Sequence, residues 1–177
     1  IMGAQHEIPL MVSAYQKGIR NYDVDKAYEA VKKTLTTQGT ALSSGGIVGN
    51  RHLDVYLKYG FVPYGEKSHH NVFGTTYEGP TSNTLEYAFD DWNAAQFAKA
   101  LGYEEDYDYF TRRAYNYKNV FDSETKYVRP KYSDGTWMPD FEPINKDEHS
   151  TSWSWLGSGF VEGNSWQYTW TVSYTHL

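Results

Sequence analysis

The sequence contains no cysteine among its 177 residues, no long apolar run and no block of basic residues. The absence of cysteine excludes a disulfide framework, a thiol nucleophile and a cysteine-bound zinc site in this chain. Without a run of about 18 apolar residues, no membrane span is predicted. The 16 basic and 22 acidic residues give a net charge of −6, which argues against nucleic acid as a partner.

Aromatic residues are abundant instead. The chain has 17 tyrosines, 6 tryptophans and 8 phenylalanines, and although its mean hydropathy is −0.70, these side chains supply the apolar surface that a core needs. Disordered chains are poor in aromatic residues, and about 100–200 residues suit one domain. The composition therefore predicts a folded, aromatic-rich domain.

Apolar residues recur at helical spacing in several segments. The pattern predicts helices over residues 9–17, 24–37, 52–59, 84–101 and 104–120. The apolar stripe of the first is Leu10, Met11, Ala14 and Tyr15, and Asn83 with Glu86 is the capping pair predicted for the fourth.

Polar, glycine-punctuated segments separate these helices. Residues 40–50, 65–80 and 131–159 are predicted as loops, and residues 127–129 as a short strand. Loops longer than about 12–15 residues are uncommon unless they are functional. We therefore expect a helical scaffold whose long loops form the rim of a site.

The densest group of sugar-binding residue types lies in residues 160–170, which contain Glu162, Asn164, Trp166 and Gln167. Aromatic faces stack on pyranose rings, and amides bridge pairs of hydroxyls. A carboxyl group beside a tryptophan is desolvated, which raises its pKa, and a general acid needs a raised pKa at neutral pH. The alternative is an aromatic-rich turn in which Glu162 is solvated or caps a helix.

The pair Asp90 and Asp91, followed by Trp92, is a second candidate. Adjacent residues of a helix point about 100° apart, so the two carboxylates do not face one substrate together. We expect one of them to point inward beside Trp92 and the other to lie in solvent. A structural hydrogen bond is the alternative to a functional role.

Candidate metal ligands are scattered. His6–Glu7 and His69–His70 lack the spacing of a zinc motif, and solvated or core histidines are the expected outcome. The acids Asp134, Asp140, Glu142 and Asp147 fall in one segment suited to calcium, but without the EF-hand pattern.

Four segments together resemble glycoside hydrolase family 92. They are Thr84–Trp92, Asn116–Asp122, Asp134–Trp137 and, above all, Glu162–Trp170, which matches a Glu-Gly-Asn-x-Trp-Gln-Tyr motif. The likeness extends over residues 1–172, whereas residues 173–177 do not match. Both ends of the chain read like the middle of a longer sequence.

The resemblance implies an all-α fold, namely part of an (α/α)6 toroid that is incomplete at both ends and follows a β-sandwich. Members of this family are exo-acting, calcium-dependent α-mannosidases, many of them bacterial, that degrade N-glycans or mannan. Residues 1–172 would thus belong to the catalytic domain, with a mannose-containing oligosaccharide as the partner. A periplasmic or secreted location follows from the same resemblance.

The resemblance also implies an inverting hydrolysis with Glu162 as the general acid. Asn164, Trp166 and Gln167 would line the site, and Asp91 and Trp92 would contact the substrate from an inner helix face. Inversion needs a second carboxylate about 6.5–9.5 Å from the acid. The family's general-base aspartates lie in a later motif, beyond Leu177, so the chain alone is expected to be inactive. The calcium ligands are not assigned.

A different class of function is a non-catalytic, helical carbohydrate-binding module. It would use Trp153, Trp155 and Trp166 as stacking platforms and would bind mannosides independently of Glu162.

Overall fold

The computed structural model describes residues 5–44, 47–69, 75, 78–144 and 159–170. Helices dominate this part of the chain: α1 (Glu7–Gln16), α2 (Val24–Thr36), α3 (Leu53–Tyr59), α4 (Pro80–Leu101), α5 (Glu104–Ala114), the 3-10 helix η1 (Tyr115–Val120) and α6 (Ser165–Thr169). Two short antiparallel ladders pair β1 (Thr40–Ala41) with β2 (Ile47–Val48) and β3 (Phe121–Asp122) with β4 (Tyr127–Val128). The expectation of a mostly helical fold is confirmed.

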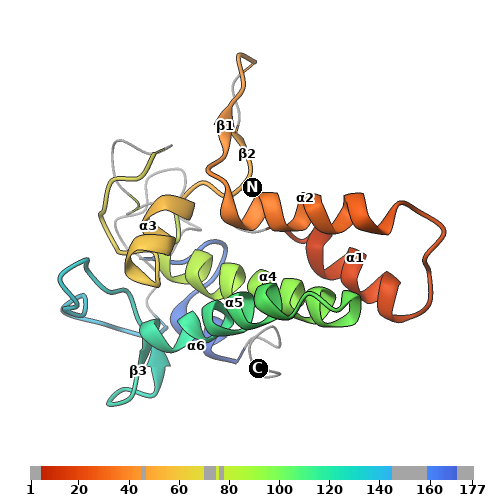
Figure 1. The fold of residues 1–177 in the computed structure, drawn as a ribbon. Coiled ribbons are helices and arrows are strands. Elements are labelled where there is room, and N and C mark those ends of the chain that lie inside the picture. Colours follow the sequence, from red (N-terminus) through yellow and green to blue (C-terminus); the bar gives the residue numbers. More distant parts are fainter. Residues whose placement is uncertain (1–4, 45–46, 70–74, 76–77, 145–158, 171–177) are drawn as a thin grey trace.

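Helix α4 lies at the centre of the molecule (Figure 1). It runs beside α5, while α1 and α2 pack on its C-terminal half and the β1–β2 hairpin projects from the body. The described residues form three apolar clusters, and each contains a residue of α4: Phe97 in one, Leu85 in the second and Tyr87 in the third. A helix that contributes to a core on several sides is an interior helix, and α4 therefore provides a fixed frame for its neighbours.

The start of α4 differs from the prediction. The helix begins at Pro80, four residues before the predicted start, and Gly79 is its N-cap. The carbonyl of Gly159 accepts hydrogen bonds from the N–H groups of Thr81 and Ser82, at 2.9 and 3.3 Å. The predicted capping role of Asn83 is wrong, because these free N–H groups are satisfied by a residue distant in the sequence.

Helices α1 and α2 form where they were predicted. In α2, the expected face of Tyr28, Val31 and Leu35 is buried, and Asp23 caps the helix by accepting from Lys26 N. In α1 the predicted stripe is wrong at Leu10, which is 72% exposed. The buried face consists instead of Ile8, Val12 and Tyr15, a spacing that also suits one helix face.

The remaining elements confirm some boundaries and correct others. Gly60 ends α3 in the left-handed conformation, as expected, and the predicted strand at residues 127–129 is present as β4. The helix predicted over residues 104–120 changes to a 3-10 helix after Ala114. The segment of residues 40–50, predicted as a loop, contains the β1–β2 hairpin.

Candidate functional site

Glu162 has an unusual backbone conformation. Its φ angle is +51°, in the left-handed region, which costs a residue with a Cβ about 1–2 kcal/mol. Its side chain is exposed to solvent. Strained residues of this kind persist where the surrounding structure fixes them, and they cluster at active sites. Lys126 and Asp140 also have positive φ, so it is the combination of this conformation with the sequence motif that makes Glu162 a candidate functional residue.

The residue before Glu162 is held by two side chains. Val161 N donates a hydrogen bond to Ser82 Oγ on α4 at 3.1 Å, and Tyr168 Oη on α6 donates to the Val161 carbonyl at 2.8 Å. Ser82 Oγ in turn donates to the Gly79 carbonyl at 2.8 Å. Helices α4 and α6 therefore both fix the chain that leads into Glu162.

Asn164 and Gln167 form a capping box at the start of α6. Gln167 N donates to Asn164 Oδ1, and Asn164 N donates to Gln167 Oε1, each at 3.0 Å. These are the two amides that were predicted to line a sugar site. The spacing of the capping box is readable in the sequence, but it was interpreted there only as part of the site.

Trp166, the predicted stacking residue, is 48% exposed. Because Glu162 is exposed as well, the described residues do not supply the expected desolvation of its carboxyl by a tryptophan. Ser165, the first residue of α6, connects this helix to β4, since its hydroxyl donates to the carbonyl of Val128. In residues 162–166, the carboxylate of Glu162 and the indole of Trp166 are therefore exposed to solvent, while hydrogen bonds hold the neighbouring backbone in place.

Glu86 is a second carboxyl group near this turn. Burial, together with the negative charges of Glu86 and Glu162, raises the pKa of the Tyr168 hydroxyl to about 12. Burial also raises the pKa of Glu86, against the opposing effect of His6. Sequence reasoning noted Glu86 only as a capping residue, although it follows Ser82 by four positions and so shares its helix face.

Asp90 lies one turn further along α4, and its side chain is fully buried. Its Oδ2 accepts a hydrogen bond from Gln5 N at 3.0 Å. Burial raises the pKa of this carboxyl well above its usual range. The expectation that one member of the Asp90–Asp91 pair lies in solvent is wrong, because both side chains are excluded from water.

Asp91 points to the opposite side of α4 from Ser82, since nine positions at about 100° each amount to two and a half turns. Its carboxylate contacts Arg113 Nη2 and the Tyr56 hydroxyl, both at 2.8 Å. Burial raises the pKa of Asp91 to about 7, and Arg113 opposes this shift. The structure therefore does not bring Asp91 together with Glu162.

Trp92 lies on a stripe of half-buried α4 residues that also contains Glu86, Phe89 and Gln96. Its ring stacks on that of Phe89, with the planes at 7° and the centroids 6.3 Å apart. Trp92 is therefore partly accessible on the less buried side of α4, and its predicted role as a substrate contact stays a prediction.

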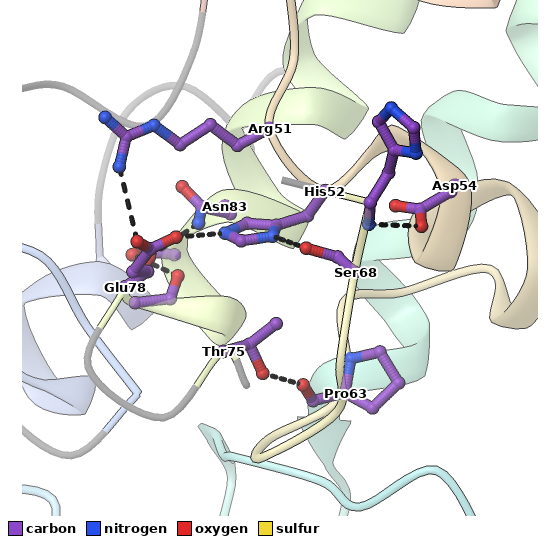
Figure 2. Close-up of polar contacts among 11 residues, drawn as sticks. Arg51, His52, Asp54, Pro63, Ser68, Thr75, Glu78 and Asn83 are labelled. Atoms are coloured by element: carbon purple, nitrogen blue, oxygen red, sulfur yellow. Dashed lines mark hydrogen bonds and ion pairs between the residues drawn. The ribbon is translucent and has the colours of Figure 1, made fainter. Parts of the chain in front are cut away.

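A polar cluster that sequence reasoning missed surrounds His52 (Figure 2). His52 Nδ1 lies 2.9 Å from Ser68 Oγ, and its Nε2 lies 2.8 Å from Glu78 Oε2. Arg51 Nη1 lies 3.3 Å from the other carboxylate oxygen, Glu78 Oε1. The Glu78 carbonyl accepts from Asn83 Nδ2 at 2.6 Å. No short motif joins these residues, so only the fold reveals them.

This cluster has the order hydroxyl, imidazole, carboxylate, which is also that of a nucleophilic triad. Ser68 and His52 are buried, however, with 6% and 0% of their surface exposed. Glu78 directly precedes Gly79, the N-cap of α4. The cluster thus ties α3 and the following loop to the start of α4, next to the chain that leads into Glu162.

The predicted metal ligands were His6, Glu7, His69, His70 and four acids of residues 134–147, and the structure describes only some of them. Among the described residues, no three histidine or carboxylate side chains gather as a metal-binding group. Asp134 accepts from the amide and hydroxyl of Thr136 in a turn, and His69 N donates to Asp54. His70, Asp147, Trp153 and Trp155 lie outside the described residues. The structure therefore assigns no ligands to the calcium that the resemblance implies.

Comparison with known proteins identifies the family. A sequence model of the "Glycosyl hydrolase family 92 catalytic domain" matches residues 1–175. The chain belongs to glycosyl hydrolase family 92. The motif matches that suggested this resemblance are therefore confirmed at the level of the family.

Two solved relatives of this family 92 chain come from Bacteroides thetaiotaomicron. An inverting mannosidase of family GH92 aligns with 96% of this chain and 20% of its own, at 31% identity and a TM-score of 0.76. A GH92 alpha-mannosidase aligns with 96% of this chain and 19% of its own, at 34% identity and a TM-score of 0.72. The latter is also known in complex with mannoimidazole.

A more distant relative is an uncharacterized secreted glycosidase of Arthroderma benhamiae. It is 29% identical over 141 residues, which is 72% of this chain and 17% of the relative. The family 92 chain thus spans about a fifth of the length of the relatives it matches. No helix in its described part is long and apolar enough to cross a membrane.

Proposed function

We propose that the chain supplies the general acid, Glu162, of an inverting α-mannosidase. In its full-length protein it would act on terminal α-linked mannose of N-glycan or mannan-type glycans. The observation that carries this proposal is the exposed carboxyl of Glu162, presented from a left-handed backbone held by α4 and α6. The names of the two solved relatives, both mannosidases, support the substrate class.

The chemistry requires two carboxyl groups. Glu162 would donate its proton to the departing glycosidic oxygen, while a base on the other side of the sugar activates a water molecule. We assign the base to residues outside this chain, and we therefore expect the 177-residue chain alone not to hydrolyse a mannobioside. Turnover of an α-mannobioside by the purified chain would overturn this assignment.

The indole of Trp166 is suited to stack on a sugar ring beside Glu162, since nearly half of its surface is exposed. Asn164 keeps an NH2 group that the capping box does not use, and it is suited to bond a sugar hydroxyl. Gln167 and Trp92 complete the predicted site, whereas we assign Asp91 to the core because its carboxylate pairs with Arg113.

We further propose that residues 1–172 form part of an (α/α)6 toroid, with α4 and α5 as one of its helix pairs, and that residues 173–177 stand outside it. The calcium expected for the family belongs to this proposal as well, and we assign none of its ligands to named residues. A periplasmic or secreted location is supported by the name of the fungal relative.

The proposal is tested by Glu162→Gln in the full-length protein. An α-mannobioside has a poor leaving group and needs the acid, so its kcat should fall by about 100- to 10,000-fold. In a dinitrophenyl mannoside the leaving group is dinitrophenolate, which departs without being protonated. The kcat on this substrate should therefore be affected far less. Glu29→Gln, which removes the charge of an exposed glutamate on α2, is the matched control and should leave both rates unchanged.

An equal loss on both substrates would contradict the acid assignment. If the natural full-length protein hydrolyses neither substrate, and Glu162→Gln binds mannosides with the same affinity as the natural protein, the carbohydrate-binding module becomes the better interpretation. Calorimetric titration with mannose and α-mannobiose measures that affinity directly.

A further inference from the structure

The peptide bond between Val161 and Glu162 determines how the Glu162 side chain is presented. This peptide is planar, so the Val161 carbonyl and the Glu162 nitrogen move together. The hydrogen bond from Tyr168 Oη to the Val161 carbonyl, 2.8 Å long, therefore fixes the orientation of the peptide plane to which the Glu162 Cα is attached. The φ angle of Glu162 is +51°, a conformation that a residue with a Cβ seldom adopts without such support.

The other peptide of Val161 is held by Ser82. Its N–H donates to Ser82 Oγ at 3.1 Å, and the Ser82 hydroxyl donates its own proton to the Gly79 carbonyl at 2.8 Å. A hydroxyl has one proton and two acceptor positions, so this geometry uses Ser82 both as donor and as acceptor. Ser82 is buried on the fixed helix α4, and its position is thus not free to drift.

The backbones of α4 and of residues 159–161 lie close together because glycine occupies position 79. A Cβ built there would lie 2.6 Å from Ser82 Oγ and 2.8 Å from Val161 N. The same segment also supplies the Gly159 carbonyl that caps Thr81 and Ser82. The contact between α4 and the chain that leads into Glu162 is therefore continuous from residue 159 to residue 161.

We propose that Ser82 and Tyr168 are positioning residues for Glu162. Their hydroxyl groups hold the two peptides of Val161, and they thereby present the Glu162 carboxyl in one direction toward the departing oxygen. Neither hydroxyl takes part in proton transfer. This inference rests on the proposed function, in which Glu162 is the general acid.

The test uses Tyr168→Phe and Ser82→Ala in the full-length protein, each of which removes one hydroxyl group. A small misplacement of a catalytic group costs up to about 100-fold in rate, so we expect kcat on an α-mannobioside to fall by about 10- to 100-fold. KM should stay within about twofold, and the rate on a dinitrophenyl mannoside should be nearly unchanged. Tyr168→Phe keeps the ring against Phe160, so it carries the test alone if Ser82→Ala does not fold.

The matched control is Tyr28→Phe. It removes a hydroxyl of α2 that donates to Asp106 on α5 at 2.7 Å. It should leave the rates on both substrates unchanged. A purely structural role for Tyr168 would lower both rates equally, and that result would overturn the inference.

The double variant Glu162→Gln with Tyr168→Phe separates the two proposals. If Tyr168 acts only through Glu162, the double variant should be no slower than Glu162→Gln alone. Additive losses would overturn the positioning role while leaving Glu162 as the acid. If Glu162→Gln itself has no effect that depends on the leaving group, both the proposed function and this inference fail.

Discussion

Arg113 Nη2 lies 2.8 Å from Asp91 Oδ1 in the interior of the molecule, and this ion pair joins α5 to α4. Arg113 Nη1 also donates to the Leu35 carbonyl of α2 at 2.9 Å. A single guanidinium thus connects three helices, and the two acids of the Asp90–Asp91 pair serve the interior rather than a shared substrate.

We expect Asp91→Ala to destabilise the full-length protein strongly. It leaves the Arg113 charge buried without its carboxylate, a loss that costs about 3–5 kcal/mol. Urea denaturation followed by tryptophan fluorescence measures the change. Lys32→Ala breaks the more exposed pair with Asp106 and should cost about 1 kcal/mol or less. Similar losses in the two variants would contradict the assignment of Asp91 to the core.

The ionisation of Asp90 should lower the free energy of unfolding as pH rises. Burial raises the pKa of Asp90 in the folded state, whereas in the unfolded chain the carboxyl ionises near pH 4. Between these two values the folded state keeps a proton that the unfolded state has lost. The free energy of unfolding therefore falls with rising pH, by up to about 1.4 kcal/mol per pH unit.

Asp90→Asn removes this titration, so its stability relative to the natural protein should increase between pH 4 and pH 7. Urea midpoints at several pH values measure the trend. Asp108→Asn, at an exposed position of α5, should give a difference that hardly depends on pH. A flat difference for Asp90→Asn would show that Asp90 is ionised in the folded protein.

Gly79 and Gly102 provide a matched pair for testing the close contact at the start of α4. Both have positive φ, but a Cβ at Gly102 meets nothing within 4 Å, whereas one at Gly79 meets Val161 and Ser82. Gly102→Ala should cost about 1–2 kcal/mol for the backbone alone. Gly79→Ala should cost about 1–3 kcal/mol more, because it adds a steric clash.

The same pair should differ in activity. Gly79→Ala should lower kcat on an α-mannobioside, because it displaces the chain that leads into Glu162, while Gly102→Ala should not. Equal stability and equal activity of the two variants would argue that the 79–161 contact is not rigid.

The capping box allows the structural and substrate-binding roles of Asn164 to be separated. Asn164→Ala should loosen α6 by about 1 kcal/mol, whereas Asn164→Asp preserves a good cap. Amide hydrogen exchange of residues 165–169 measures this local stability. If Asn164 also binds substrate, Asn164→Asp should raise KM while exchange stays unchanged. An unchanged KM would assign Asn164 to the cap alone.

Sequence patterns predicted helix faces and helix ends well where residues only a few positions apart determine them. The face of α2 and the glycine that ends α3 follow from periodicity and from backbone freedom within a few residues. The start of α4 could not be predicted in this way. The N–H groups of its first turn bond to the carbonyl of Gly159, about eighty positions away in the sequence. Similarly, the exposure of Leu10 depends on which side of α1 meets α4.

The sequence by itself determined the helical character of the chain, its family and the identity of the acid candidate, since spacing and motif are local properties. The tertiary structure decided which groups are brought together. It buried Asp90 and Asp91 against different partners, assembled the unpredicted His52 cluster, and brought the hydroxyls of Ser82 and Tyr168 to the backbone of Val161, which precedes Glu162. These relationships join residues from separate segments, and only the packing of α4 against its neighbours fixes them.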